Sequence, residues 1–225
     1  METIDVREPP SAASEQAEFE LMKVANDERL TSLDRLWKAV YRAELGWFAS
    51  DEITLFGDEF HSSSIYLEAT LARQPVGLLR LVRRETAGLP VERFADLCGL
   101  IPDRDARVIE CQRLVVLDRY RSYKSPMAPF GIWPALMKAT LQLCLRDSIT
   151  HMIADCFLDT PTTPIKSLKR IGFKETGLAF TDTELNVASM STVLTLDIRD
   201  MLRVLYQTGN DFAKYILSID DHISL

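Results

Sequence analysis

The sequence predicts a single α/β domain, and three observations support this. The chain has 225 residues, 47% hydrophobic and 26% charged, the composition of a globular protein with one large core. Segments with the period of strands alternate with segments with the period of helices. At the centre, residues 107–148 form a predicted strand, a basic turn-rich connection and an amphipathic helix. We expect a flexible N-terminal arm at 1–17, the domain at 18–198 and a C-terminal helical extension at 199–225.

Hydrophobic periodicity locates the elements of the first half. We expect a half-buried strand at 19–24, a helix from Thr31 or Ser32 to Gly46, and a hairpin of strands at 65–71 and 76–82. Arg80 is embedded in the apolar pattern of the second hairpin strand. It therefore needs an anionic partner if it is buried, or must extend to the sheet edge.

The second half continues the alternation. We expect a short helical piece at 91–97, strands at 108–116, 149–156, 173–180 and 191–198, helices at 132–145 and 163–170, and a terminal helix followed by a second amphipathic segment after Arg199. Pro164 is expected at the first position of its helix, and Gly172 closes that helix.

Composition and charge exclude several classes of protein. The net charge of −7 argues against a nonspecific nucleic-acid-binding surface. No apolar run approaches the roughly 20 residues of a membrane span, and the acidic N-terminal stretch lacks the pattern of a signal peptide, so we expect a cytoplasmic protein. The cysteines lack C-x-x-C spacing and only three histidines accompany them, so we expect reduced thiols and no metal site; the cysteines are Cys98, Cys111, Cys144 and Cys156.

The predicted central strand contains polar residues where a buried strand should be apolar. Glu110, Gln112 and Arg113 interrupt a run of aliphatic residues. A buried charge is costly unless it is paired or has a function. Glu110 and Arg113 are therefore candidate catalytic residues, and the alternative is a buried ion pair that only stabilises the fold.

The connection after this strand is basic. Arg119, Arg121 and Lys124 precede a helix whose first N–H groups are unpaired and carry the positive end of the helix dipole. This arrangement can hold a pyrophosphate or a phosphopantetheine, so the three residues are candidate cofactor-binding residues. The alternative is an ordinary solvated turn. The acidic connection at 47–62 is either a substrate lid or a solvated loop.

Five short motifs occur in order between about residues 30 and 198. They are Tyr41–Trp47 (YRAELGW), Asp58–Phe60 (DEF), Val76–Leu81 (VGLLRL), Phe94, and Glu110–Val116 (ECQRLVV). In this order and spacing they resemble the motifs of the acyl-homoserine-lactone (autoinducer) synthases and of the related N-acyl amino acid synthases, two branches of the Gcn5-related N-acyltransferase superfamily.

The resemblance implies a fold and an activity. The fold is a single mixed, mostly antiparallel central sheet flanked by helices, in which the donor lies in a splay between two central strands. The activity is transfer of an acyl group from a thioester of CoA or of an acyl carrier protein to a primary amine, with the thioester as a substrate and no permanently bound cofactor. The matching positions make Trp47, Asp58, Arg80 and Phe94 candidate substrate-binding residues.

The acceptor site departs most from the family pattern. Phe56 and His61 stand where the family has two of three carboxylates around S-adenosylmethionine, and Asp58 alone remains. This balance favours a zwitterionic amino acid as the acceptor. The rival is S-adenosylmethionine, with Asp51, Glu52 or Glu59 supplying the missing charges.

The implied reaction needs a proton acceptor and an oxyanion donor. Glu110 is the candidate acceptor, directly or through a water, and a β-bulge between it and Arg113 would turn both side chains toward one cleft. The donor is expected among the N–H groups from Leu114 to Val116. Two alternatives stay open: Cys111 as a nucleophile, and a non-catalytic acyl-thioester-binding or scaffold module.

Overall fold

A computed structural model describes residues 18–48, 52–101, 106–185, 187–220 and 223–225. The described residues form one eight-stranded sheet, in the order β6-β7-β5-β4-β3-β2-β1-β8. The strands are β1 Phe19–Lys23, β2 Ser64–Leu71, β3 Gln74–Arg83, β4 Val108–Val116, β5 His151–Phe157, β6 Lys174–Phe180, β7 Ser191–Asp197 and β8 Ile223–Ser224. Neighbouring strands are antiparallel except for the β4–β5 and β1–β8 pairs, which are parallel. The mixed, mostly antiparallel sheet predicted from the sequence is therefore confirmed.

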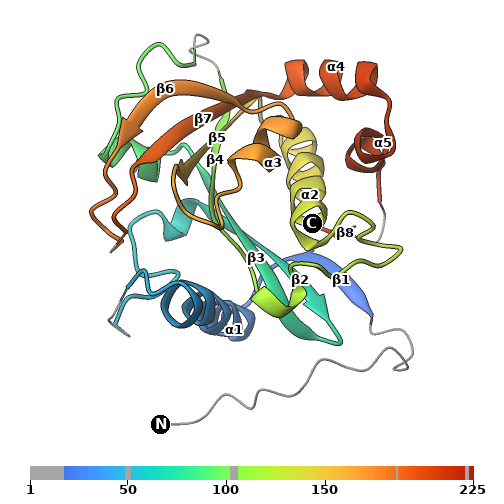
Figure 1. The fold of residues 1–225 in the computed structure, drawn as a ribbon, viewed down its shortest axis with the longest axis horizontal. Helices are drawn as coiled ribbons and strands as arrows, with labels where there is room; N and C mark the ends of the chain where they lie inside the picture. The colour runs from blue at the N-terminus through green and yellow to red at the C-terminus, as the bar shows by residue number, and fades with distance from the viewer. Residues whose placement is uncertain (1–17, 49–51, 102–105, 186, 221–222) are drawn as a thin grey trace.

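Helices cover both faces of this sheet (Figure 1). They are α1 Asp27–Lys38, α2 Ile132–Arg146, α3 Ile165–Arg170, α4 Ile198–Thr208 and α5 Asp211–Leu217, with a π-helical turn at Ala39–Glu44 and 3₁₀ turns at His61–Ser63, Pro90–Arg93 and Asp118–Tyr120. Helix α1 packs on one face over β2, β3 and β4, and α2 to α5 pack on the other. We call these the α1 face and the α2 face.

Helix α1 begins earlier than the sequence analysis placed it. The side chain of Asn26 accepts a hydrogen bond from the N–H of Arg29 at 2.9 Å, so Asn26 caps the helix and α1 begins at Asp27. The predicted start at Thr31 or Ser32 was wrong. The hydroxyls of these two residues instead donate to carbonyl oxygens one turn earlier, a bond that residues inside a helix make.

Two glycines fix how the helices join the sheet. Gly46 ends the π-helical turn at a φ of +68°, a conformation that glycine adopts without strain, and the predicted helix end is confirmed. A Cβ atom on Gly77 of β3 would lie 2.8 Å from the Cγ2 atom of Ile132, so glycine at this position lets the start of α2 approach the sheet.

The remaining predicted helices and strands are present, with small corrections. Position 164 caps α3 instead of being its first residue, and the helical piece at 91–97 is a shorter 3₁₀ turn. The expected terminal helices are α4 and α5, and β8 after them joins the sheet beside β1. The predicted arm at 1–17 lies outside the described residues. No helix in the described part of the chain is long and apolar enough to cross a membrane.

Candidate active site

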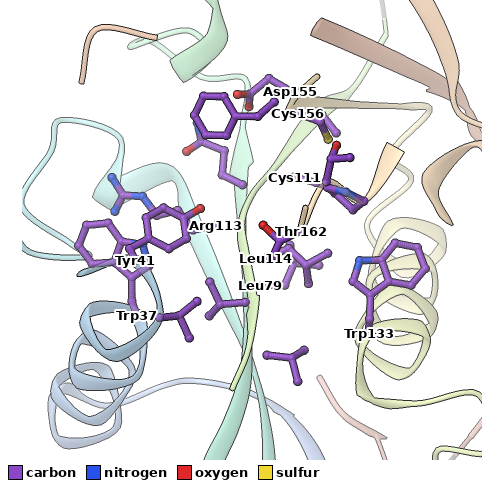
Figure 2. A pocket seen from close by; sticks show the side chains of 18 of the residues that line it. Trp37, Tyr41, Leu79, Cys111, Arg113, Leu114, Trp133, Asp155, Cys156 and Thr162 are labelled. Atoms are coloured by element: carbon purple, nitrogen blue, oxygen red, sulfur yellow. The ribbon is translucent and has the colours of Figure 1, made fainter. Parts of the chain in front are cut away.

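The two central strands separate half-way along their length. β4 and β5 pair in parallel from Val108 with His151 to Cys111 with Ala154, and beyond that point β4 follows β3 while β5 follows β7. A cavity of about 1170 Å³ opens in this splay. Figure 2 shows Trp37, Tyr41 and Arg113 on one side of it and Trp133 of α2 on the opposite side.

A β-bulge shapes the wall of the cavity on β4. Leu78 pairs with Val115 and Arg80 pairs with Gln112, so two residues of β4, Arg113 and Leu114, lie opposite Leu79 alone. Arg113 adopts a φ of +50°, a strained conformation for a residue other than glycine. The irregularity expected between Glu110 and Arg113 therefore exists, and it lies at Arg113 itself. It directs the Arg113 side chain to the α1 face, toward Asp58 and Trp37.

Asp58 and two arginines form an ionic network on the α1 face. Arg80 is fully buried and donates from Nη1 and Nη2 to the two Asp58 oxygens, both at 2.6 Å, and from Nε to Ser64 at 2.8 Å. Arg113 donates to Asp58 at 3.2 Å and to the carbonyl oxygen of Leu55. Burial raises the pKa of Asp58, but the hydrogen bonds and charge of Arg80 outweigh it and hold this pKa below its usual value. The partner that Arg80 required is Asp58.

Glu110 lies behind the cavity wall. The side chain is fully buried, one carboxyl oxygen accepts from the N–H of Val91 at 3.0 Å, and the other finds no hydrogen-bond partner among the described residues. Burial, and secondly the charge of Asp155, raise the pKa of Glu110 well above its usual value. Glu110 is not among the described residues that line the cavity, and its burial favours the protonated form of its carboxyl group.

Asp155 of β5 is a site residue that the sequence analysis missed. Its carboxyl group faces the cavity near Cys156 (Figure 2). Burial, followed by the charge of Asp182, raises the pKa of Asp155 to about 7. The available signal was a carboxylate within the apolar run of a predicted strand, the same anomaly that singled out Glu110.

Aromatic side chains close the cavity near α1. Trp47 meets the rings of Tyr41 and Phe157 edge-on, at 4.7 and 5.0 Å between centroids, and therefore joins the end of the π-helical turn to the end of β5. All three residues line the cavity. Burial raises the pKa of Tyr41, so its hydroxyl stays neutral. Phe94, by contrast, stacks on Phe180 and is not among the described lining residues.

The start of α2 forms the opposite wall. The helix follows Gly131, which has a φ of +104°, and no side chain caps its first N–H groups. Two buried polar atoms, Nε1 of Trp133 and Oγ1 of Thr163, lack a hydrogen-bond partner in the described structure. Both residues line the cavity. Polar groups of this kind are available to a ligand.

The three basic residues of the predicted loop differ in their surroundings. Arg121 lines the cavity but is already paired with Glu44 at 2.6 Å and Asp118 at 2.7 Å. Lys124 lines the cavity and is exposed. Arg119 stacks over the Tyr120 ring and does not belong to the described lining residues. Lys124 is thus the residue of this loop best placed for a phosphate.

Among the described residues, the cysteines and acidic side chains form no metal site. All four cysteines are free thiols, and no group of metal-ligating side chains is found among the described residues. Cys111 lines the cavity, but burial raises the pKa of its thiol well above the usual value, which disfavours the thiolate that a nucleophile needs.

Comparison with solved structures identifies the fold. The chain is similar to FeeM, an N-acyl amino acid synthase from uncultured soil microbes, with 14% identity over 87% of this chain and 99% of the FeeM chain and a TM-score of 0.68. The fold is that of the Gcn5-related N-acyltransferases. The resemblance seen in the sequence is confirmed at this level.

Two further structures share this fold. BjaI, a CoA-dependent acyl-homoserine lactone synthase with bound S-adenosylmethionine and isopentyl-CoA, is 19% identical over 88% of this chain and 99% of its own, with a TM-score of 0.61. MesI, another CoA-dependent acyl-homoserine lactone synthase, is 22% identical over 85% and 97%, with a TM-score of 0.54. No protein-family model matches the sequence, and no curated protein matches it.

Proposed function

We propose that the protein is an N-acyltransferase that moves an acyl group from a thioester to the primary amine of an amino-acid-like acceptor. The observation that carries this proposal is the cavity in the β4–β5 splay, which extends from the uncapped start of α2 to the arginine network on the α1 face. A thioester with its phosphates at α2 would place its acyl carbonyl beside the β4 bulge. FeeM, an N-acyl amino acid synthase, and BjaI, a CoA-dependent acyl-homoserine lactone synthase, share the fold.

The edge of β4 supports oxyanion stabilisation. The N–H of Leu117 donates to the carbonyl oxygen of Val76 at 3.1 Å, on the β3 side. Successive N–H groups of a strand point to opposite edges, so the N–H of Val116 points into the splay. There it can donate to the negative oxygen that forms when an amine attacks the thioester.

The arginine network favours an acceptor with a carboxylate. Arg80 and Arg113 carry two positive charges against the single negative charge of Asp58. Arg113 is the more accessible of the two, with 17% of its side chain exposed against 0% for Arg80. It is therefore the group assigned to the acceptor's carboxylate, and the fixed geometry of the guanidinium suits that role. The proton of the acceptor's ammonium goes to one of two carboxyl groups, Glu110 or Asp155.

The charge of the same cavity also supports S-adenosylmethionine as the acceptor. Glu52 and Glu59, two of the three residues named as possible replacements, line the cavity together with Asp58. Glu59 pairs with Arg93, however, which reduces the charge it presents. The third residue, Asp51, lies outside the described residues.

Thiol release tests the activity. Octanoyl-CoA and an octanoyl-loaded acyl carrier protein serve as donors, and the standard amino acids or S-adenosylmethionine as acceptors. We expect release that depends on the amine, together with an amide product detected by mass spectrometry. An absence of release with every pair would favour a binding or scaffold module.

Calorimetric titration decides the acceptor. We expect the amino acid that gives the most release to bind, and S-adenosylmethionine not to bind at micromolar concentration. Micromolar binding of S-adenosylmethionine that weakens in Asp58→Asn, while Asp159→Asn on the surface leaves it unchanged, would reverse this preference.

A further inference from the structure

Asp155 occupies a position that the acyl-transfer reaction needs. In the parallel pairing of β4 with β5, Glu110 lies beside Ile153 and Cys111 beside Ala154. Because side chains alternate along a strand, Asp155 emerges on the same face as Glu110, immediately past the point where the strands separate. Asp155 therefore lines the open part of the splay, whereas Glu110 lies behind its wall.

The groups around Asp155 are acidic or neutral. They are Glu110 on β4, Cys156 on β5, Tyr41 on the π-helical turn, and Asp182 and Glu184 after β6. No ion pair of Asp155 is found in the described part of the chain. A carboxylate in this setting lacks a protein cation and attracts a cation brought by a ligand.

The nearby arginines bond to groups other than Asp155. Arg113 bonds to Asp58 and the Leu55 carbonyl, and Arg93 pairs with Glu59 and Glu184. The cavity thus holds an arginine side and, across the splay, a carboxylate side. A zwitterionic acceptor carries one charge for each side.

We infer that Asp155 binds the ammonium group of the acceptor and takes its proton. This inference rests on the proposed acyl transfer. The ammonium nitrogen gives one proton to the Asp155 carboxylate, and its freed electron pair forms the C–N bond at the thioester carbon. The carbonyl electron pair moves to oxygen and returns as the C–S bond breaks. The second nitrogen proton leaves with the thiolate sulfur, and Asp155 passes its proton to water, so thioester and ammonium give amide, thiol and one proton.

The titration of Asp155 suits this role. A general base works best when its pKa lies near the working pH, and that of Asp155 is raised to about 7. Glu110 is fully buried, and this burial, followed by the charge of Asp155, raises the pKa of Glu110 well above its usual value, which makes it a less suitable base.

The test compares two acceptors in Asp155→Asn. With an amino acid, whose amine is protonated at pH 7, we expect kcat/KM for thiol release to fall about 10²-fold, the usual contribution of a positioned base. With hydroxylamine, which is already neutral at pH 7, we expect a fall of less than about fivefold. Asp159→Asn, an exposed carboxylate beyond the same strand, should change neither.

The pH profile separates this inference from the proposed function. In the wild type, kcat/KM with the amino acid should rise through pH about 7 and level off, and Asp155→Asn should lose that rise. Equal losses with both acceptors, or a rise that persists in the variant, would overturn the assignment of Asp155 and leave acyl transfer intact. If the wild type releases no thiol with any acceptor, both the role of Asp155 and the proposed acyl transfer are overturned.

A second measurement avoids dependence on the variant's folding. If Asp155→Asn does not fold, the wild-type profile is recorded with acceptors of different amine pKa. A rise near pH 7 that is common to all of them supports a base on the protein. A rise that follows the pKa of each acceptor shows that only the free amine reacts, and overturns the inference.

Discussion

The two faces of the central sheet differ in the residues that they bury. On the α2 face, β3 and β4 present Leu79, Leu81 and Ile109 to the apolar side of α2. On the α1 face, the same strands present Arg80 and Glu110, both fully buried. On the α2 face, burial of apolar side chains stabilises the fold. On the α1 face, the cost of desolvating charged groups offsets part of the stabilisation from burial.

Stability alone does not account for the polar face. A buried ion pair is often replaced by apolar residues without loss of stability, and Glu110 leaves one carboxyl oxygen unpartnered in the described structure. Proteins retain destabilising buried polar residues of this kind at functional sites. Asp58, which pairs with the buried Arg80, and Arg113 line the open splay, where a substrate can contact them. The apolar residues of the α2 face therefore stabilise the sheet, whereas the polar residues of the α1 face that line the splay are available to act on a ligand.

The largest expected effect comes from breaking the ionic network. Asp58→Asn leaves the buried Arg80 without its counter-charge, and we expect a loss of about 3–5 kcal/mol in the free energy of unfolding at pH 7. Leu81→Ala on the α2 face should cost about 2–5 kcal/mol through the cavity it leaves. Urea denaturation measures both.

The dependence on pH distinguishes these two losses. The pKa of Asp58 is lower in the folded protein than its usual value, so its contribution is complete at neutral pH and is lost as the pH falls through the folded-state pKa. The effect of Asp58→Asn should shrink in acid, while that of Leu81→Ala should not. An effect of Asp58→Asn that stays constant from pH 7 to pH 3 would show that its charge is not what stabilises the network.

Sequence reasoning singled out Asp58, Arg80 and Arg113 separately, but it did not show that both arginines pair with Asp58. Arg80, Glu110 and Arg113 stood out because charges interrupted apolar periods, and such local patterns also located the strands. The bulge was expected only because the implied reaction needs Glu110 and Arg113 on one side, and its position at Arg113 comes from the pairing of β3 with β4. Asp155 was missed because its position beside the splay depends on where the β4–β5 pairing stops, which is a property of two segments about 40 residues apart. The start of α1 was misplaced because Thr31 and Ser32 have the same capping chemistry as Asn26.

A smaller effect is expected at Glu110. The pKa of Glu110 is higher in the folded protein than in the unfolded chain, so the folded state binds more protons and wild-type stability falls as the pH rises above the unfolded value. Glu110→Gln removes this fall, since an amide does not ionise and its oxygen can still accept from Val91. Melting temperatures should be measured from pH 5 to pH 9. The melting temperature of the variant should rise relative to that of the wild type as the pH increases, by about 2–4 °C for each kcal/mol of difference in the free energy of unfolding.

The same variant sharpens the assignment of the base. If Asp155 takes the proton, Glu110→Gln should lower kcat less than about tenfold and keep the rise of kcat/KM near pH 7. Loss of that rise, with a fall of about 10² or more, would instead make Glu110 the base, as the sequence alone predicted.

The smallest expected effect lies at the donor end, where charges are exposed and water screens them. Lys124 lines the cavity at the loop before α2, and Arg121 beside it is already paired with Glu44 and Asp118. We expect Lys124→Ala to raise the KM for octanoyl-CoA about three- to tenfold and to leave kcat unchanged, because a phosphate contact far from the reacting carbon binds ground and transition states alike. The increase should shrink as salt is added.

Octanoyl-pantetheine, which lacks the nucleotide phosphates, supplies the decisive comparison. Its KM should be the same in Lys124→Ala and in the wild type, since the phosphate partner is missing from the substrate. Arg73→Ala, which removes an exposed cation at the β2–β3 turn, should change neither donor. An equal rise in KM for both donors would mean that the lysine acts through the shape of the loop. A fall in kcat at unchanged KM would remove the loop from donor binding altogether, and with it the proposed orientation of the thioester along the splay.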